Sequence, residues 1–183
     1  MTGMSKLTGP LILALLPLAV ALATDNPDPA ATRGPGLLQP FKQSLKTALQ
    51  QGLAEGPVAA IDACRVEAPE LAARMSRDGV RMGRASHRLR NAANRGPAWV
   101  TPLLERYSTE PAQAESVVIS LGTERAGYVE PIYLQTQCLA CHGKSLAPAV
   151  ATQLQALYPN DQATGFEAGE FRGVFWVEFP LDP

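Results

Sequence analysis

The first third of the chain has apolar residues at helical spacing. Between residues 37 and 53, apolar side chains recur every three or four positions with lysines and glutamines between them: Leu38, Phe41, Leu45, Leu49 and Leu53. This period predicts a helix with one apolar face. Glu55-Gly56-Pro57 ends this helix, and Pro57 suits the first position of a second one, because that position makes no amide hydrogen bond. Residues 68–75 predict a short third helix.

Strand-like runs dominate the middle and the end of the chain. Residues 116–121 and 128–134 are rich in β-branched and aromatic side chains, and the glycine-bounded link between them predicts a hairpin. The other expected elements are strands at 79–84, which 86–90 could continue or pair with, and at 173–179, and helices at 99–107 and 148–157. Helices followed by strands interleaved with short helices predict an α+β fold with a small antiparallel sheet.

The N-terminal segment has the features of a secretory signal. Lys6 is its lone charge, an apolar run follows from residue 11 to 23, and Ala21-Leu22-Ala23 gives a cleavage site of small residues. The run is short and broken by prolines, so we expect no stable membrane span after cleavage, with an uncleaved anchor as the alternative. We therefore expect a signal peptide at 1–23, a disordered proline-rich leader at 24–36, a single domain at 37–183, and a periplasmic protein.

Charge excludes some classes of partner. The chain has 183 residues, with 16 basic against 17 acidic side chains, which is close to neutrality. A near-neutral domain of this size is not expected to bind nucleic acid or a membrane surface in general.

The most specific motif is Cys138-Leu139-Ala140-Cys141-His142, followed by Gly143. Two thiols separated by two residues and followed by a histidine form the attachment pattern of c-type haem. The thiols add to the vinyl groups on one edge of the porphyrin, and His142 then lies where it can ligate the iron. We expect one covalent haem c, attached through Cys138 and Cys141.

Other interpretations of the cysteine pair are a zinc site, a redox disulfide or chance. Zinc takes four ligands as a rule, and this chain has three cysteines and two histidines in all, with His87 far from the motif. A thioredoxin-like pair expects a βαβ context, which does not surround the motif. An export signal favours haem attachment.

The second axial position of the iron has several candidates. Cys64 is the third, unpaired cysteine of a chain that we expect to be exported, and iron would stabilise its thiolate. Its alternative is a small buried apolar residue. His87, Met75 and Met82 are further candidates, although a partly exposed polar residue and two packing residues are the simpler interpretations.

The arginine-rich segment suggests a place for the haem propionates. Guanidinium groups bind carboxylates through paired, charge-assisted hydrogen bonds. On a strand, Arg84, Arg88 and Arg90 would share one face, and we choose Arg84 and Arg90 as propionate partners. The alternative is a solvated, charged edge strand.

Four strings in this order resemble the PAS-like c-type haem domain family, which is mostly catalogued as a domain of unknown function. They are Ile61-Asp62-Ala63-Cys64 with Ala68-Pro69-Glu70; residues 83–91 with Asn94; Pro131-Ile132 leading into residues 138–143; and residues 158–166 with 169–173. The resemblance extends from about residue 38 to 180. It implies a PAS-like sheet flanked by helices and axial ligation by His142 and Cys64. Ala92 and Glu170 stand where the family usually has proline and aspartate; neither position is an implied ligand.

These features lead to two functional hypotheses. Thiolate donation stabilises ferric iron and lowers the reduction potential, which suits a redox or small-ligand sensor. Its ligand could be a small gas, and its output would pass to a separate signalling or redox partner. The alternative is a low-potential periplasmic electron-transfer cytochrome. We expect no enzymatic activity, because Cys64 would block the iron face that a peroxide needs.

Overall fold

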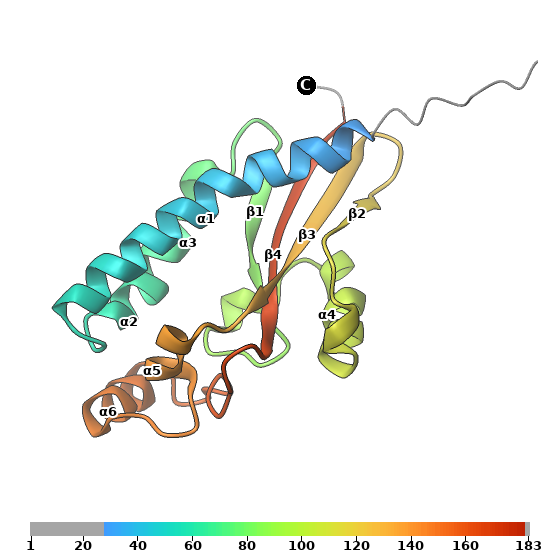
Figure 1. The fold of residues 1–183 in the computed structure, drawn as a ribbon. Helices are drawn as coiled ribbons and strands as arrows, with labels where there is room; N and C mark the ends of the chain where they lie inside the picture. Colours follow the sequence, from blue (N-terminus) through green and yellow to red (C-terminus); the bar gives the residue numbers. More distant parts are fainter. Residues whose placement is uncertain (1–27, 182–183) are drawn as a thin grey trace, which may run out of the picture.

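The computed structural model describes residues 28–181, which form a four-stranded antiparallel sheet flanked by helices (Figure 1). The strands lie in the order β1-β4-β3-β2, with bounds β1 Arg81–Ala85, β2 Val117–Ser120, β3 Arg125–Tyr133 and β4 Phe171–Pro180. The long strands β3 and β4 pair at the centre, and β2 and β3 form the expected hairpin. The expected α+β, PAS-like fold with a small antiparallel sheet is confirmed.

Helix α1 (Pro29–Glu55) covers one face of this sheet (Figure 1). Asp28 caps its first turn by accepting a hydrogen bond from the Ala30 amide, 2.9 Å away, and Pro29 occupies a first-turn position that needs no amide proton. Residues 29–36 are therefore helical, and the expected leader boundary at Gly36 is wrong. Residues 24–27 and the expected signal peptide lie outside the described residues.

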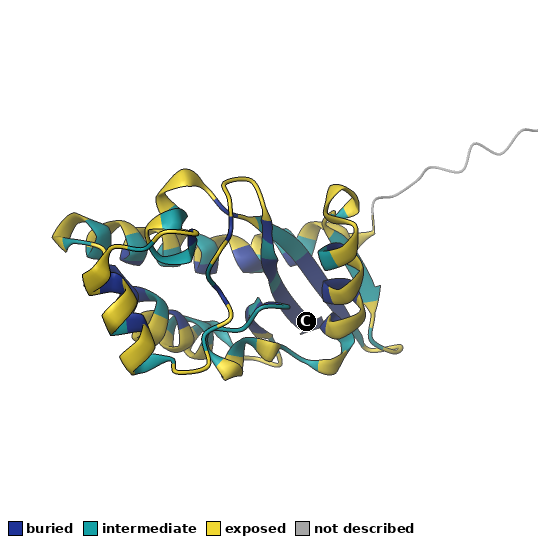
Figure 2. Cartoon of the chain, turned by 90° about the horizontal axis from the view of Figure 1, so that it is seen from below, coloured by how far each residue is buried: buried dark blue, intermediate teal, exposed yellow. Residues whose placement is uncertain are grey.

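Successive side chains of a strand point to opposite faces of the sheet, so each face has its own hydrophobic cluster. Leu38 and Phe41 of α1 are fully buried in a cluster with Val177 of β4. On the opposite face, α4 (Thr101–Thr109) buries Tyr107 in a cluster with Val174 of β4. In Figure 2 the buried residues accordingly follow the strands and the sides of the helices that face them.

A second helical run, from residue 60 to 75, lies beside the C-terminal half of α1 (Figure 1). It consists of α2 (Ala60–Asp62), the π-helical turn η1 (Ala63–Glu67) and α3 (Ala68–Met75). Sequence analysis predicts separate helices beginning at Pro57 and near residue 68. In the structure residues 57–59 form a turn, and α2 and α3 join through the π turn.

The remaining elements are short helices around the ends of the strands. They are η2 (Ala92–Arg95), η3 (Ala98–Val100), η4 (Pro111–Gln113), η5 (Thr136–Cys138), α5 (Leu139–His142) and α6 (Pro148–Leu157). The bounds of α6 are those expected from the sequence. Strand β1, in contrast, ends at Ala85, so the possible continuation through 86–90 is wrong. Within the described residues no helix is long and apolar enough to cross a membrane.

Candidate cofactor site

A cavity of about 630 Å³ lies among α1, the helical run 60–75, the sheet and α5. Its volume is within the range of about 300–1,000 Å³ that is usual for small-molecule and cofactor sites. The six residues chosen from the sequence as haem partners all line it: Cys64, Arg84, Arg90, Cys138, Cys141 and His142. The fold thus joins residues from the first half of the chain to the late cysteine motif.

The cysteine motif forms one short helical turn at the cavity wall. Cys138 ends η5, and Cys141 and His142 belong to α5, so both thiols come from the same turn of chain. Both cysteines are half-buried and free. Burial is the main cause that raises the pKa of the Cys141 thiol, and the nearby Arg90 opposes it. The two thiols therefore lie together on one side of the cavity, and neither forms a disulfide with a described residue.

The ring of His142 has a fixed proton. Its Nδ1 lies 2.6 Å from the carbonyl oxygen of Ala163. Because a carbonyl only accepts hydrogen bonds, Nδ1 must carry the proton, and Nε2 keeps its lone pair. Burial, with the positive charges of Arg90 and Arg172, lowers the pKa of His142 from 6.5 to about 3. The imidazole is thus neutral at ordinary pH, which is the state that a metal ligand requires.

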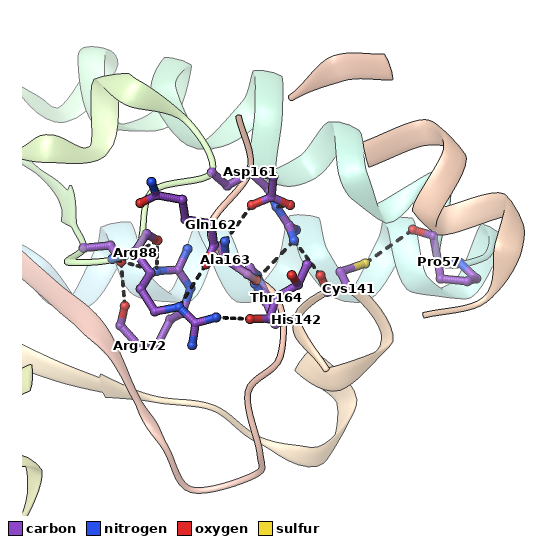
Figure 3. A network of polar contacts seen from close by, with 11 residues as sticks. Pro57, Arg88, Cys141, His142, Asp161, Gln162, Ala163, Thr164 and Arg172 are labelled. Carbon is purple, nitrogen blue, oxygen red and sulfur yellow. Dashed lines mark hydrogen bonds and ion pairs between the residues drawn. The ribbon is translucent and has the colours of Figure 1, made fainter. Parts of the chain in front are cut away.

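The loop at residues 161–166 holds α5 in place (Figure 3). The Phe166 amide donates to the His142 carbonyl at 3.0 Å, and the Gly165 amide donates to Gly143 at 3.0 Å. Asp161 supports this loop by accepting from the Ala163 amide at 2.7 Å. These backbone contacts fix the position of the carbonyl that orients the His142 ring.

Arg90 connects this loop to the cysteine motif. Its Nε donates to Asp161 at 2.9 Å, and its Nη2 donates to the carbonyls of Cys141 at 2.6 Å and Ala163 at 3.3 Å. The side chains of the Arg90–Asp161 pair are only 10% and 11% exposed. Arg90 therefore lies at the cavity with most of its hydrogen-bonding capacity already directed to the protein.

Cys64 approaches the cavity from the helical run 60–75. It is half-buried and lies in the π turn η1, a wide turn that occurs frequently at functional sites. The neighbouring Ile61 is 4% exposed and packs in a cluster with Cys141 and α6. This packing holds the run against α5, so Cys64 and the cysteine motif line the same cavity.

Arg88 lies outside this cavity. Because β1 ends at Ala85, the expectation that Arg84, Arg88 and Arg90 share a strand face is wrong. The guanidinium of Arg88 lies 4.0 Å from the ring centroid of Phe166, and its Nε donates to the Gln162 carbonyl at 2.9 Å (Figure 3). Arg88 thereby braces the loop that follows Asp161.

Arg172 is a cavity residue that sequence reasoning missed. It follows the first residue of β4 and lines the cavity together with Arg84. Burial, with repulsion from Arg84 and Arg90, lowers its pKa from 12.5 to about 10. The available sequence signal was an arginine at the start of a mostly apolar final strand.

The other residues considered as iron ligands do not line this cavity. His87 stacks on Phe171, with ring centroids 5.5 Å apart, and borders a separate cavity of about 350 Å³. Met82 is 6% exposed in the cluster beneath α1, and Met75 packs against that cluster. Packing roles therefore account for both methionines.

Comparisons with known proteins agree with the fold. The family described as Tll0287-like matches residues 23–180. The crystal structure of the cyanobacterial heme-protein Tll0287 superposes with a TM-score of 0.54 and 22% identity, over 80% of this chain and 96% of that chain. At this identity the superposition establishes a shared fold. No curated protein matches the chain. The chain belongs to the Tll0287-like family.

Proposed function

We propose that this protein is an exported c-type haem protein with one haem attached through Cys138 and Cys141. One observation supports the proposal above all: two free thiols, a third thiol and a neutral imidazole line the same cavity. The similar structure of a cyanobacterial heme-protein gives a precedent for haem in this fold. When bound, haem supplies a one-electron redox centre and an iron that can take small ligands.

The residues present fit this group. Cys138 and Cys141 would form the thioether bonds, and Nε2 of His142 is the nitrogen left available for iron by the Ala163 hydrogen bond. Cys64 would supply sulfur as the second protein ligand of the iron, and Arg84 is one of the two propionate partners expected from the sequence. Each of these residues lines the cavity, whose volume of about 630 Å³ suits a cofactor.

A redox or small-ligand sensor is the function that the axial pair supports best. Cys64 belongs to a helical run separate from the cysteine motif. A change at the iron that weakens the sulfur bond would therefore be transmitted to η1 and to the helix beside it. Packing of this run against α1 gives such a change a route to the surface and to a partner.

Low-potential electron transfer is the second candidate. Cys138 and Cys141 are half-buried, so the edge of an attached porphyrin would lie near the protein surface. An accessible porphyrin edge suits electron exchange with another exported protein. Stable ligation in both oxidation states and no uptake of CO would favour this function over sensing.

The test begins with covalent attachment. The chain is produced in an export-competent host with a cytochrome maturation system, and its mass is measured after denaturation. The proposal requires a mass increase of one haem, and its loss in the Cys138→Ser/Cys141→Ser protein. A colourless wild-type product with an unmodified mass would contradict the proposed function.

The second test concerns Cys64. In Cys64→Ala, we expect the ferric spectrum to lose its thiolate character and the reduction potential to rise by more than ~59 mV, a tenfold shift of a one-electron equilibrium. Val66→Ala is the matched control, because Val66 is in the same π turn and 37% exposed. A spectrum that is unchanged in Cys64→Ala would remove sulfur from the ligand set. Redox titration with and without CO then separates sensor from carrier.

A further inference from the structure

Four arginines gather around the candidate site with little negative charge to balance them: Arg84, Arg88, Arg90 and Arg172. Within residues 28–181, Arg90 is the member of this group that forms an ion pair, and its partner Asp161 is 11% exposed. Arg88 donates hydrogen bonds to backbone carbonyls, and its guanidinium lies over the Phe166 ring. Of these four arginines, Arg84 and Arg172 are therefore the two that line the cavity and form no ion pair with a described carboxylate.

The hydrogen bonds of Arg172 leave part of its guanidinium free. Its Nη1 donates to the Arg88 carbonyl at 3.0 Å and also to the Ser86 hydroxyl (Figure 3). Among the described residues, its Nε and Nη2 have no hydrogen-bond partner. Arg84 contributes one long contact, from Nη2 to the Cys64 carbonyl at 3.5 Å. Both guanidinium groups thus keep donors that can reach an anion.

A desolvated positive charge without a counter-ion is destabilising, and an ionised carboxylate is its natural partner. The fork of a guanidinium group matches the two oxygens of a carboxylate, which gives short and directional hydrogen bonds. The two arginines come from adjacent strands, near the end of β1 and the start of β4, where these strands pair. The sheet therefore fixes both of them on one wall of the cavity.

We propose that Arg84 and Arg172 form the anion site that receives the haem propionates, and that Arg90 serves as a positioning residue for α5. This inference rests on the proposed function, because the anion is part of the haem. The sequence-based choice was Arg84 together with Arg90. In the proposed pair, Arg172 of β4 takes the place of Arg90.

The experiment uses the protein with its covalent haem and the variants Arg84→Gln, Arg172→Gln and Arg172→Lys. The readouts are the reduction potential and the propionate bending bands in resonance Raman spectra. Losing either positive charge near the iron favours the ferric state, so each Gln variant should shift the ferric–ferrous equilibrium roughly tenfold, or ~59 mV towards lower potential. The propionate bands should shift in both. Arg172→Lys should restore the potential but not the bands, because lysine keeps the charge and loses the fork.

Arg95→Gln is the matched control, since it removes an exposed arginine of the same segment. It should leave both readouts unchanged. Arg90→Gln should broaden the His142–iron signals without moving the propionate bands. Unchanged bands in Arg172→Gln, or shifted bands in Arg90→Gln alone, would overturn the Arg84–Arg172 assignment. If Arg172→Gln fails to accumulate, Arg172→Lys decides the question. Unchanged propionate bands in Arg172→Lys would overturn the Arg84–Arg172 assignment, and shifted bands would support it. A wild-type protein without covalent haem refutes the proposed function instead, before any arginine is compared.

Discussion

The environment of His142 is built from three contributions that act on one ring. The Ala163 carbonyl fixes the proton on Nδ1, burial keeps the ring neutral, and Arg90 adds positive charge. Arg90 also donates to the carbonyls of Cys141 and Ala163, on either side of the ring. A single side chain therefore contributes to both the position and the electrostatics of the His142 ring.

Replacing Arg90 should be costly for the fold. Arg90→Ala would leave Asp161 buried without its charged partner, and breaking a buried pair in this way costs about 3–5 kcal/mol. Urea unfolding followed by fluorescence measures the loss. Arg74→Ala is the control, because Arg74 and Glu70 are 62% and 59% exposed and such pairs contribute about 0–1 kcal/mol. Equal losses in the two variants would contradict a clamping role for Arg90.

His87 predicts a pH dependence of stability. Its Nδ1 is buried without a hydrogen-bond partner, and burial, followed by Arg172 and Arg88, lowers its pKa below 6.5. The unfolded chain therefore binds the proton more readily than the folded protein does, so stability is complete above pH 6.5 and is lost as the pH falls. His87→Phe, which can still stack on Phe171, should show a flatter urea midpoint between about pH 7.5 and 5. An identical pH profile in the variant would show that His87 does not titrate in this way.

At the scale of elements, α1 depends on a close approach to the sheet. A Cβ atom added at Gly34 would lie 2.5 Å from Cγ of Tyr128, whereas one added at Gly36 would meet nothing within 4 Å. The two glycines therefore have different structural roles in the same helix. Gly34 allows contact with β3, while Gly36 adds only backbone freedom.

These two glycines make a matched pair of substitutions. Gly36→Ala should stabilise the protein by up to about 1 kcal/mol, because alanine is the better helix former. Gly34→Ala should destabilise it by about 1–3 kcal/mol, since the helix must move away from Tyr128. Thermal unfolding monitored by circular dichroism measures both. Stabilisation by both substitutions would show that α1 does not need this contact.

Sequence patterns predicted the elements better than their ends. The apolar faces of α1 and α6 and the β2–β3 hairpin follow local periodicity, and all three form as expected. The start of α1 was missed because its prolines indicated a leader, although Pro29 lies in the first turn and Asp28 provides a cap. Likewise, the sequence did not predict the π turn at Cys64, which lies in η1 where this segment contacts α1.

For the molecule as a whole, the candidate site follows from long-range pairing that local patterns do not reveal. The cysteine motif identified its own turn, and Cys64 was added as the unpaired third cysteine, a choice that agrees with the family resemblance. The role of Arg172 required the structure, because β4 must pair with β1 before Arg172 and Arg84 come together. Arg90, in contrast, was placed at the site by sequence analysis. Only the structure shows that it connects Asp161 to the carbonyls of Cys141 and Ala163.

The proposed haem should support one end of the molecule more than the other. The cavity separates the run 60–75 and the motif segment 136–166 from the strand ends, whereas α4 packs on the sheet away from it. In Cys138→Ser/Cys141→Ser, hydrogen exchange should therefore accelerate in those two segments and stay slow in β3 and β4. Mass spectrometry of the exchanged peptides measures this. Uniform acceleration across the sheet would mean that the haem supports the whole fold.

The position of β4 in the sheet determines when the cavity can close. This strand follows every other described element in the sequence, yet it pairs with both β1 and β3. A chain still emerging from a ribosome consequently has no completed sheet, even after the cysteine motif has appeared. If the proposed function holds, the two thiols would thus be accessible for haem attachment before the C-terminal strand docks and completes the cavity wall.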